Sequence, residues 1–319
     1  MIPDQELISL GKTGISIPPI GVGAMAWGDR IFWGYGRGYG EADVKGAYET
    51  SLAAGITFID TAEVYGQGVS EILLGKFLRE LPHTTETSPI VVATKFFPYP
   101  WRLFKGSLKQ ALLGSLRRMQ LEKVDLYQIH WPFPPVPIET WVSALADVVE
   151  EGLARAVGVS NYNLIQMRKA QAVLAERGLF LASNQVEFSL INRKIERNGL
   201  LKLCQQQGIT CIAYSPLGRG VLTGKYNSKN PPSGIRGRRY SSKYLDKIEP
   251  LIRLLHEIGQ EHGGKTPGQV ALNWVMRKGA VPIPGAKNRQ QALENAGALG
   301  WHISDSELIA LDQASNRLT

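Results

Sequence analysis

Short apolar runs alternate with amphipathic stretches along most of this 319-residue chain. Eight of the runs are typical of buried parallel strands, because they are nearly continuous in apolar residues and are bounded by glycine, proline or polar positions. They cover residues 18–23, 56–59, 90–95, 124–130, 154–160, 182–187, 210–214 and 280–284. The stretches between them carry apolar residues at helical spacing, at 41–54, 70–81, 107–119, 138–151, 164–177, 198–207, 266–277 and 289–298. This alternation predicts an α/β fold with a parallel sheet, and eight repeats predict closure into a (β/α)8 TIM barrel.

Two features lie outside the repeat. Residues 5–17 have the pattern of an N-terminal β-hairpin, and extra helices are expected at 244–262 and 304–315, near the C-terminus. The rival architecture, an open doubly wound sheet, usually has a Gly-x-Gly-x-x-Gly turn after its first strand. Here residues 21–23 read Gly-Val-Gly and residues 24–26 read Ala-Met-Ala, so the third glycine is missing. No shift in composition marks a boundary, and we expect residues 1–319 to form one barrel domain.

A composition of 44% hydrophobic and 20% charged residues is ordinary for a soluble globular protein. The two cysteines, Cys204 and Cys211, give neither a disulfide framework nor the spacing of metal ligands, which suits a reducing compartment. The chain has no run of about 18 apolar residues and begins without the basic and apolar regions of a signal peptide. We therefore expect a cytoplasmic protein with no membrane partner, either a monomer or a weak homo-oligomer.

The formal net charge of +8 is compatible with nucleic acid, an anionic surface or an anionic small molecule as the partner. The one dense cluster contains Arg236, Arg238 and Arg239, in a segment rich in proline, glycine and serine. No nucleic-acid-binding motif accompanies it, so we expect no nucleic-acid partner. A solvated loop is the first interpretation of this cluster, and a phosphate-bearing ligand is the second.

Polar side chains stand at the ends of several predicted strands. Asp60 ends the second strand and is followed by Tyr65, while Lys95 and His130 end the third and fourth. Because the carboxyl ends of barrel strands meet at one mouth, these four residues are expected to lie together. A single strand-end lysine is usually a surface residue, and a single histidine is usually structural. Four such residues on adjacent strands favour a functional site.

These residue types suit proton donation to a carbonyl oxygen. A tyrosine has a pKa of about 10, and a nearby ammonium is expected to lower it by favouring the phenolate. Tyr65 is thus the candidate acid and Lys95 its partner, with Asp60 holding the lysine and His130 orienting the carbonyl. The five histidines are scattered singly, so no metal site is expected. Such a reaction needs an external reductant, and hydride transfer belongs to a cofactor.

The chain resembles the aldo-keto reductase superfamily from the hairpin to the final helices. The segment from Gly55 to Gly66 is similar to the family's first signature, with Asp60 and Tyr65 on its catalytic positions. Lys95 after Val92-Ala93-Thr94, and His130 at the end of Asp125-Leu126-Tyr127-Gln128-Ile129, complete the family's catalytic four. The resemblance implies NADPH as the cofactor and a small-molecule carbonyl as the substrate.

The resemblance also implies the cofactor contacts. Ser160, Asn161 and Gln185 would hold the nicotinamide carboxamide, and Tyr214 would stack on its ring with Ser215 next to it in the cofactor site. Leu217, Gly218 and Arg219 would run along the pyrophosphate. The adenosine-phosphate segment would comprise Gly285, Lys287, Gln291, Glu294 and Asn295. Lys287 would meet the 2′-phosphate, which favours NADPH over NADH. Taken alone, Lys287 is equally well interpreted as an exposed lysine beside a helix.

The first strand is followed by a departure from the common family pattern. Residues 31–40 form a loop rich in glycine and aromatic residues, which would either shape a substrate pocket or pack onto the barrel. Trp27, Phe96 and Trp131 stand near strand ends and are the candidate pocket residues. An apolar mouth of this kind suits aromatic or aliphatic aldehydes.

Three functions compete. The first is an NADPH-dependent reductase of aldehydes or ketones. The second follows from the resemblance, because potassium-channel β subunits share the fold and bind NADPH while acting chiefly as channel partners. The lack of an N-terminal extension suited to a partner favours the enzyme. The third is an isomerase or aldolase acting on sugar phosphates, with Lys95 forming a Schiff base.

Overall fold

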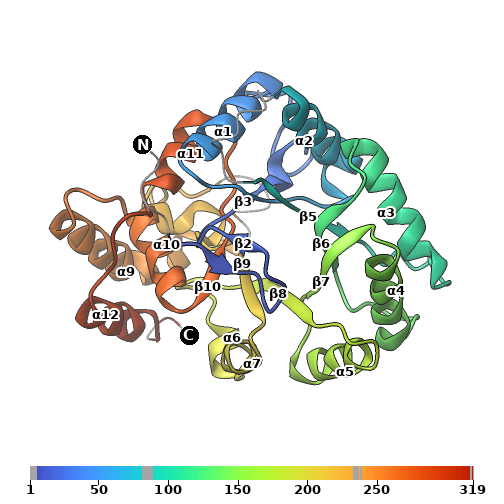
Figure 1. Ribbon diagram of the computed structural model, residues 1–319. Coiled ribbons are helices and arrows are strands. Elements are labelled where there is room, and N and C mark those ends of the chain that lie inside the picture. The colour runs from blue at the N-terminus through green and yellow to red at the C-terminus, as the bar shows by residue number, and fades with distance from the viewer. Residues whose placement is uncertain (1–5, 81–88, 233–236, 238, 317, 319) are drawn as a thin grey trace.

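A computed structural model describes residues 6–80, 89–232, 237, 239–316 and 318. Eight strands form one parallel sheet that follows chain order, and a ring of helices surrounds it (Figure 1). The strands are β3 (Val22–Gly23), β4 (Phe58–Asp60), β5 (Val91–Phe96), β6 (Val124–Ile129), β7 (Ala154–Ser160), β8 (Leu181–Glu187), β9 (Thr210–Tyr214) and β10 (Ala280–Pro282). The predicted (β/α)8 architecture is confirmed.

A helix follows each strand of the barrel, and the segments after β8, β9 and β10 each contain a second helix. The helices are α1 (Glu41–Ala53), α2 (Val69–Glu80), α3 (Gly106–Met119), α4 (Ile138–Glu150), α5 (Leu164–Ala175), α6 (Lys194–Arg197), α7 (Leu200–Gln207), α9 (Ser242–Glu261), α10 (Pro267–Arg277), α11 (Arg289–Ala296) and α12 (Asp305–Asn316). Short 3-10 turns occur at η1 (Ala24–Ala26), η2 (Tyr65–Gly68) and η3 (Gly218–Thr223). The extra helices near the C-terminus are α9 and α12, which lie outside the ring in Figure 1. None of the helices described here is both long and apolar enough to cross a membrane.

The barrel closes between its first and last strands. The Gly21 amide donates to the Pro282 carbonyl at 2.9 Å, and the Gly23 amide donates to the Pro284 carbonyl at 3.0 Å. Glycine is required at this seam, since a Cβ on Gly23 would lie 2.8 Å from the carbonyl oxygen of Ile283. Closure joins the two outer strands of this sheet and brings the carboxyl ends of all eight strands to one mouth.

The interior of the barrel is apolar at its amino end. Alternate strand residues point inward, and the inward set packs against the hairpin formed by β1 (Ile8–Ser9) and β2 (Ser16–Ile17). This inner cluster consists of Leu10, Ile15, Ile17, Phe58, Val91, Ala93, Leu126, Ala156, Ala182, Ile212, Val281 and Ile283. The Gly11 amide bonds to the hydroxyl of Thr210, the first residue of β9, at 2.8 Å. The confirmed N-terminal hairpin therefore plugs the amino end, and the opposite end is left for polar residues.

The structure describes only part of the predicted basic cluster. Arg236 and Arg238 lie outside the described residues. Arg239 is within them, and its Nη2 lies 2.8 Å from Oε1 of Glu187 at the end of β8. At least this member of the cluster is therefore paired with a carboxylate and is not simply solvated.

Helices α2 and α3 approach each other closely enough that one contact requires glycine. A Cβ on Gly75, in α2, would lie 2.3 Å from the carbonyl oxygen of Met119, the last residue of α3. We expect Gly75→Ala to lower the free energy of unfolding by about 1–3 kcal/mol, because the two helices must separate. Gly46→Ala, in α1, is the matched control. Its Cβ would meet nothing closer than 3.9 Å, so helix propensity should make it neutral or stabilising by up to about 1 kcal/mol. Urea denaturation of both variants checks this, and equal effects would contradict it.

Candidate active site

The site is built around the side chain of Lys95, which is fully buried near the carboxyl end of β5. Its ammonium is paired with Oδ1 of Asp60 at the end of β4. It also donates to the carbonyl oxygen of Thr61 at 2.8 Å and to the hydroxyl oxygen of Tyr65 at 3.2 Å. Its three donors thus meet three acceptors, which is what a buried ammonium needs to remain charged.

Asp60 is equally well satisfied. Its second oxygen, Oδ2, accepts hydrogen bonds from the side-chain amides of Gln185 at 2.8 Å and Gln128 at 3.2 Å. Both glutamines are buried, and they reach Asp60 from β8 and β6. Gln128 was not among the predicted site residues, although it stands two residues before His130 and therefore faces the same side of the strand.

Tyr65 lies on the turn after β4 and faces His130. The two rings meet edge to face, with centroids 5.7 Å apart and an interplanar angle of 80°. Glu63 holds this turn against the next one, since its Oε1 accepts from the backbone amide of Phe97 at 2.7 Å. Arg102 binds the same carboxylate with both Nη atoms, at 2.5 and 3.0 Å. The phenol is thus positioned by the loops after β4 and β5 together.

Burial controls the ionisation of the site. Desolvation raises the pKa of Tyr65 above its ordinary value, and the opposing positive charge of Lys95 does not outweigh it. Lys95 does lower this pKa, as predicted, but its effect is smaller than the opposing effect of burial. Desolvation alone would lower the pKa of Lys95, but Asp60 reverses this and the net pKa is raised. Burial and the charge of Lys95 hold the pKa of His130 well below its ordinary value. At neutral pH the tyrosine is protonated, the lysine is charged and the histidine is neutral.

The carboxyl ends of β7 and β9 are linked to the catalytic candidates by hydrogen bonds. Ser160 is buried and donates its hydroxyl to the Gln185 carbonyl at 2.8 Å. Asn161 adopts a left-handed backbone with φ of 63°. Its side-chain Nδ2 donates to the His130 carbonyl at 3.1 Å, and its Oδ1 accepts from the Tyr214 hydroxyl at 2.9 Å. The structure therefore brings these four predicted residues beside the catalytic candidates.

The backbone after β9 is irregular. Ser215, Gly218, Arg219 and Gly220 all have positive φ values, of 53°, 55°, 57° and 93°. Left-handed conformations at Ser215 and Arg219 are costly for residues with side chains, and such strain is often found at ligand sites. Burial raises the pKa of the Tyr214 phenol to about 12, and the positive charge of Arg219 opposes this rise. Leu217 lies within this segment, between Ser215 and Gly218.

The predicted adenosine-phosphate segment gathers around the start of α11. The Lys287 amide donates to Oε1 of Gln291 at 3.0 Å, and the side chain of Asn295 donates to the Gly285 carbonyl at 3.4 Å. Glu294 is exposed on the same helix and accepts from the Gln290 amide at 3.3 Å. The Lys287 ammonium contacts the loop at residues 31–40, where it donates a hydrogen bond to the Trp33 carbonyl at 2.9 Å.

Two of the predicted pocket residues are in the core instead. Trp27 is fully buried against Tyr48 and Phe77. Phe96 is also fully buried and packs on Trp141 with centroids 4.8 Å apart. The prediction that Trp27 and Phe96 line the pocket is therefore wrong. For Phe96 the reason is strand alternation, because Lys95 points into the barrel and its neighbour must point outward to the helices.

Phe97 takes the place that was predicted for Phe96. Its ring lies edge to face with His130, with centroids 5.6 Å apart. From it an aromatic cluster extends outward, consisting of Phe97, Tyr99, Trp101, Trp131 and Phe133. Trp131 and Phe133 are stacked at 5.3 Å with 2° between their planes, and Tyr99 and Trp101 are stacked at 4.5 Å with 11°. The mouth beside His130 is thus lined by flat aromatic surfaces.

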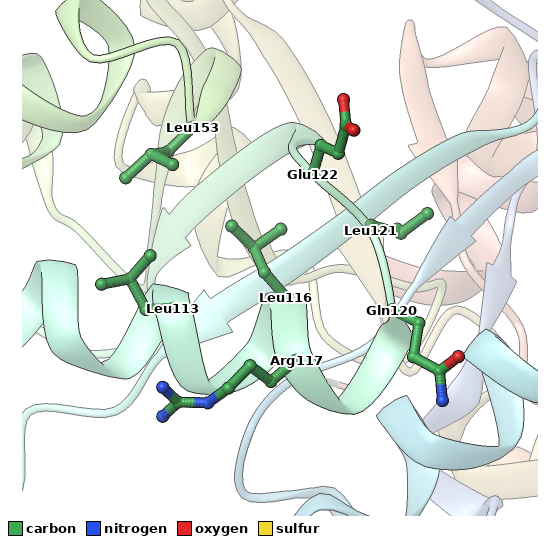
Figure 2. Close-up of a pocket in the computed structure, with 7 residues that line it drawn as sticks. All are labelled: Leu113, Leu116, Arg117, Gln120, Leu121, Glu122 and Leu153. Carbon is green, nitrogen blue, oxygen red and sulfur yellow. The ribbon is translucent and has the colours of Figure 1, made fainter.

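A different hollow, of about 400 Å³, lies away from this mouth. Figure 2 shows its lining, which includes Leu116, Arg117 and Leu121 from the end of α3 and the segment after it. Leu121 and Glu122 precede β6 and Leu153 precedes β7, so the hollow is at the amino ends of the strands.

Within the residues that the structure describes, no group of three histidine, cysteine or acidic side chains is arranged to hold a metal ion. The polar cluster around Lys95, Tyr65 and His130 at the carboxyl ends of the strands is the candidate active site.

Comparison with known proteins finds similar proteins over nearly the whole chain. The family model described as the aldo/keto reductase family matches residues 19–316. A chloroplastic pyridoxal reductase of Arabidopsis thaliana is 41% identical over 309 residues, covering 94% of this chain and 84% of the plant protein.

Two solved structures are also similar over nearly their whole lengths. A thermostable aldo-keto reductase, solved with the inhibitor epalrestat, has a TM-score of 0.75 and 31% identity, covering 97% of this chain and 99% of the other. An aldo-keto reductase of Klebsiella pneumoniae, solved with NADPH, has a TM-score of 0.74 and 28% identity, covering 97% and 94%. With the family model matching nearly the whole chain, this protein belongs to the aldo/keto reductase family.

Proposed function

We propose that the protein reduces an aldehyde or ketone to the alcohol with NADPH, and that Tyr65 donates the proton. The observation that carries the proposal is the hydrogen bond between the buried Lys95 ammonium and the Tyr65 hydroxyl, at 3.2 Å, next to His130. A protonated phenol beside a fixed positive charge is suited to general acid catalysis, because the charge stabilises the phenolate left behind.

The chain's own residues fit a bound dinucleotide phosphate. Lys287 offers an ammonium at the start of α11, and the left-handed backbone of Gly218 to Gly220 can follow a pyrophosphate closely. Ser160, Asn161 and Gln185 would hold the nicotinamide amide near Tyr214. When bound, NADPH supplies the hydride that reduces the carbonyl carbon.

The four catalytic candidates would then handle the carbonyl oxygen. As the C=O π bond breaks, the oxygen takes the proton of Tyr65, and Lys95 stabilises the resulting phenolate. His130 is neutral because burial lowers its pKa, so it can donate one N–H to the same oxygen without adding charge. Asp60 keeps Lys95 charged and in place.

The paired state of Lys95 opposes the isomerase or aldolase alternative. A Schiff base requires a neutral amine with a free approach to the substrate. Here the pKa of Lys95 is raised, and the ammonium is engaged by Asp60, Thr61 and Tyr65.

For the substrate we propose an aromatic aldehyde. The stacked pair of Trp131 and Phe133, with Phe97 beside His130, offers flat apolar surfaces on which an aromatic ring can lie. The plant relative is named for pyridoxal, which is an aromatic aldehyde. Its name also includes a chloroplast location, so the cytoplasmic location expected for this chain stays a prediction, as does its oligomeric state.

Replacing the proposed proton donor tests the chemistry. We expect Tyr65→Phe to lower kcat/KM for pyridoxal by about 10²- to 10⁴-fold, since that is the usual contribution of a positioned acid. The affinity for NADPH should stay within about twofold, because the ring is retained. Tyr99→Phe, at the same mouth, is the control and should retain activity. NADPH oxidation followed by absorbance, with calorimetric NADPH binding, measures both quantities.

Two outcomes would contradict this assignment. Full activity of Tyr65→Phe would remove Tyr65 as the proton donor. Tight NADPH binding by the wild type without turnover of any carbonyl in a panel of aldehydes would instead favour the alternative, a binding protein similar to the channel β subunits.

Replacing the stacked tryptophan tests the substrate class. We expect Trp131→Leu to lower kcat/KM for pyridoxal and benzaldehyde about threefold to tenfold relative to butanal, because only the aromatic substrates lose ring stacking. Trp141→Leu, a core substitution away from the mouth, controls for general destabilisation. An equal loss for aromatic and aliphatic aldehydes would reject the proposed preference.

A further inference from the structure

The loop between η1 and α1 is held in a defined shape by its own residues. Oδ1 of Asp29 accepts from the backbone amides of Ile31 at 2.9 Å and Phe32 at 2.8 Å. The Tyr35 amide returns to the Asp29 carbonyl at 2.9 Å. The Tyr39 hydroxyl donates to the Ala26 carbonyl at 2.6 Å, which ties the end of the loop to its beginning. Hydrogen bonds within the loop therefore define its conformation.

This loop is also fixed to the segment that carries Lys287. Buried Trp27 donates its indole N–H to the Ala286 carbonyl at 2.9 Å, and Gly23 forms a parallel bridge with Gly285. Through Trp27 at the beginning of the loop, and through Gly23 in the preceding strand, these contacts reach the two residues that precede Lys287. These contacts therefore fix the position of the loop relative to the segment that carries Lys287.

Two aromatic rings of the loop cover the lysine. The Lys287 ammonium lies 4.8 Å from the ring centroid of Trp33 and 4.6 Å from that of Tyr39. It also donates to the Trp33 carbonyl at 2.9 Å. The rings and the carbonyl are neutral, so they locate the ammonium without cancelling its charge. Cation–π contacts of this geometry are favourable, and most so when partly desolvated. The side chains of Trp33, Tyr39 and Lys287 are all partly buried.

We propose that Trp33 and Tyr39 are specificity-determining residues, which hold the Lys287 ammonium ready for the 2′-phosphate of NADPH. The inference rests on the proposed function, in which Lys287 receives that phosphate. A free lysine side chain loses much conformational freedom when it binds an anion. Here the rings have already restricted the side chain, so binding of the 2′-phosphate costs less. NADH lacks this phosphate and gains nothing from the arrangement.

The test compares the affinities for NADPH and NADH, measured by calorimetry, without substrate. We expect the double variant Trp33→Leu/Tyr39→Leu to weaken NADPH binding about fivefold to tenfold. Binding of NADH should change less than about twofold. Tyr39→Phe keeps the ring and should retain the wild-type ratio of the two affinities. Phe32→Leu, at an exposed neighbouring position of the loop, controls for disturbance of the loop, and circular dichroism confirms folding.

Lys287→Ala separates failure of this inference from failure of the proposed function. If Lys287→Ala weakens NADPH selectively while the double variant keeps the wild-type ratio, the role of the rings is overturned and the phosphate site stands. If Lys287→Ala weakens both cofactors equally, the proposed 2′-phosphate contact itself fails. Tighter NADPH binding by the double variant would show that the rings compete with the phosphate, and an equal loss for both cofactors would show only a structural role. Either result overturns the proposal.

Discussion

The structure of the site depends on one buried ion pair, between Lys95 on β5 and Asp60 on β4. Both side chains are almost fully removed from solvent, so each needs the other and a full set of hydrogen bonds. Removing one partner of such a pair typically costs about 3–5 kcal/mol, because the remaining charge is left uncompensated. The pair also connects the site across the barrel, since Gln128 and Gln185 reach Asp60 from two further strands. The curvature of the closed barrel brings these strands to one carboxylate.

The inside of the barrel has an apolar layer at its amino end and a polar layer at its carboxyl end, and this division supports the buried ion pair. The layer at the amino end of the barrel is apolar and includes buried residues of the hairpin segment. The layer at the carboxyl end is polar and small, and Gly158 shows how tightly it is packed, since a Cβ there would lie 2.2 Å from the hydroxyl oxygen of Ser183. Low water access strengthens the electrostatic effect of Lys95 on its neighbours. The same burial raises the pKa of Tyr65, which keeps the phenol protonated and able to donate.

The repeat of strands and helices was readable from the sequence, because its apolar periodicity is strong and regular. The grouping of Asp60, Tyr65, Lys95 and His130 followed from it, since barrel topology brings strand ends together. Gln128 and Phe97 were accessible to the same alternation rule, and neglect of that rule placed Phe96 in the pocket. Other features were not accessible. The balance between burial and charge at Tyr65 depends on packing, and the contact of Lys287 with Trp33 joins residues that are 254 positions apart.

The central claim is that Asp60 and Lys95 act on Tyr65 as a unit, and a double-mutant cycle tests it most directly. The measurement is kcat/KM of Asp60→Asn, Lys95→Met and the double variant with one aldehyde, at NADPH concentrations that saturate each variant. Since either substitution already disables the charged partner of Tyr65, the double variant should lose about as much activity as the more impaired single variant. Losses that multiply, as for two independent residues, would contradict the account.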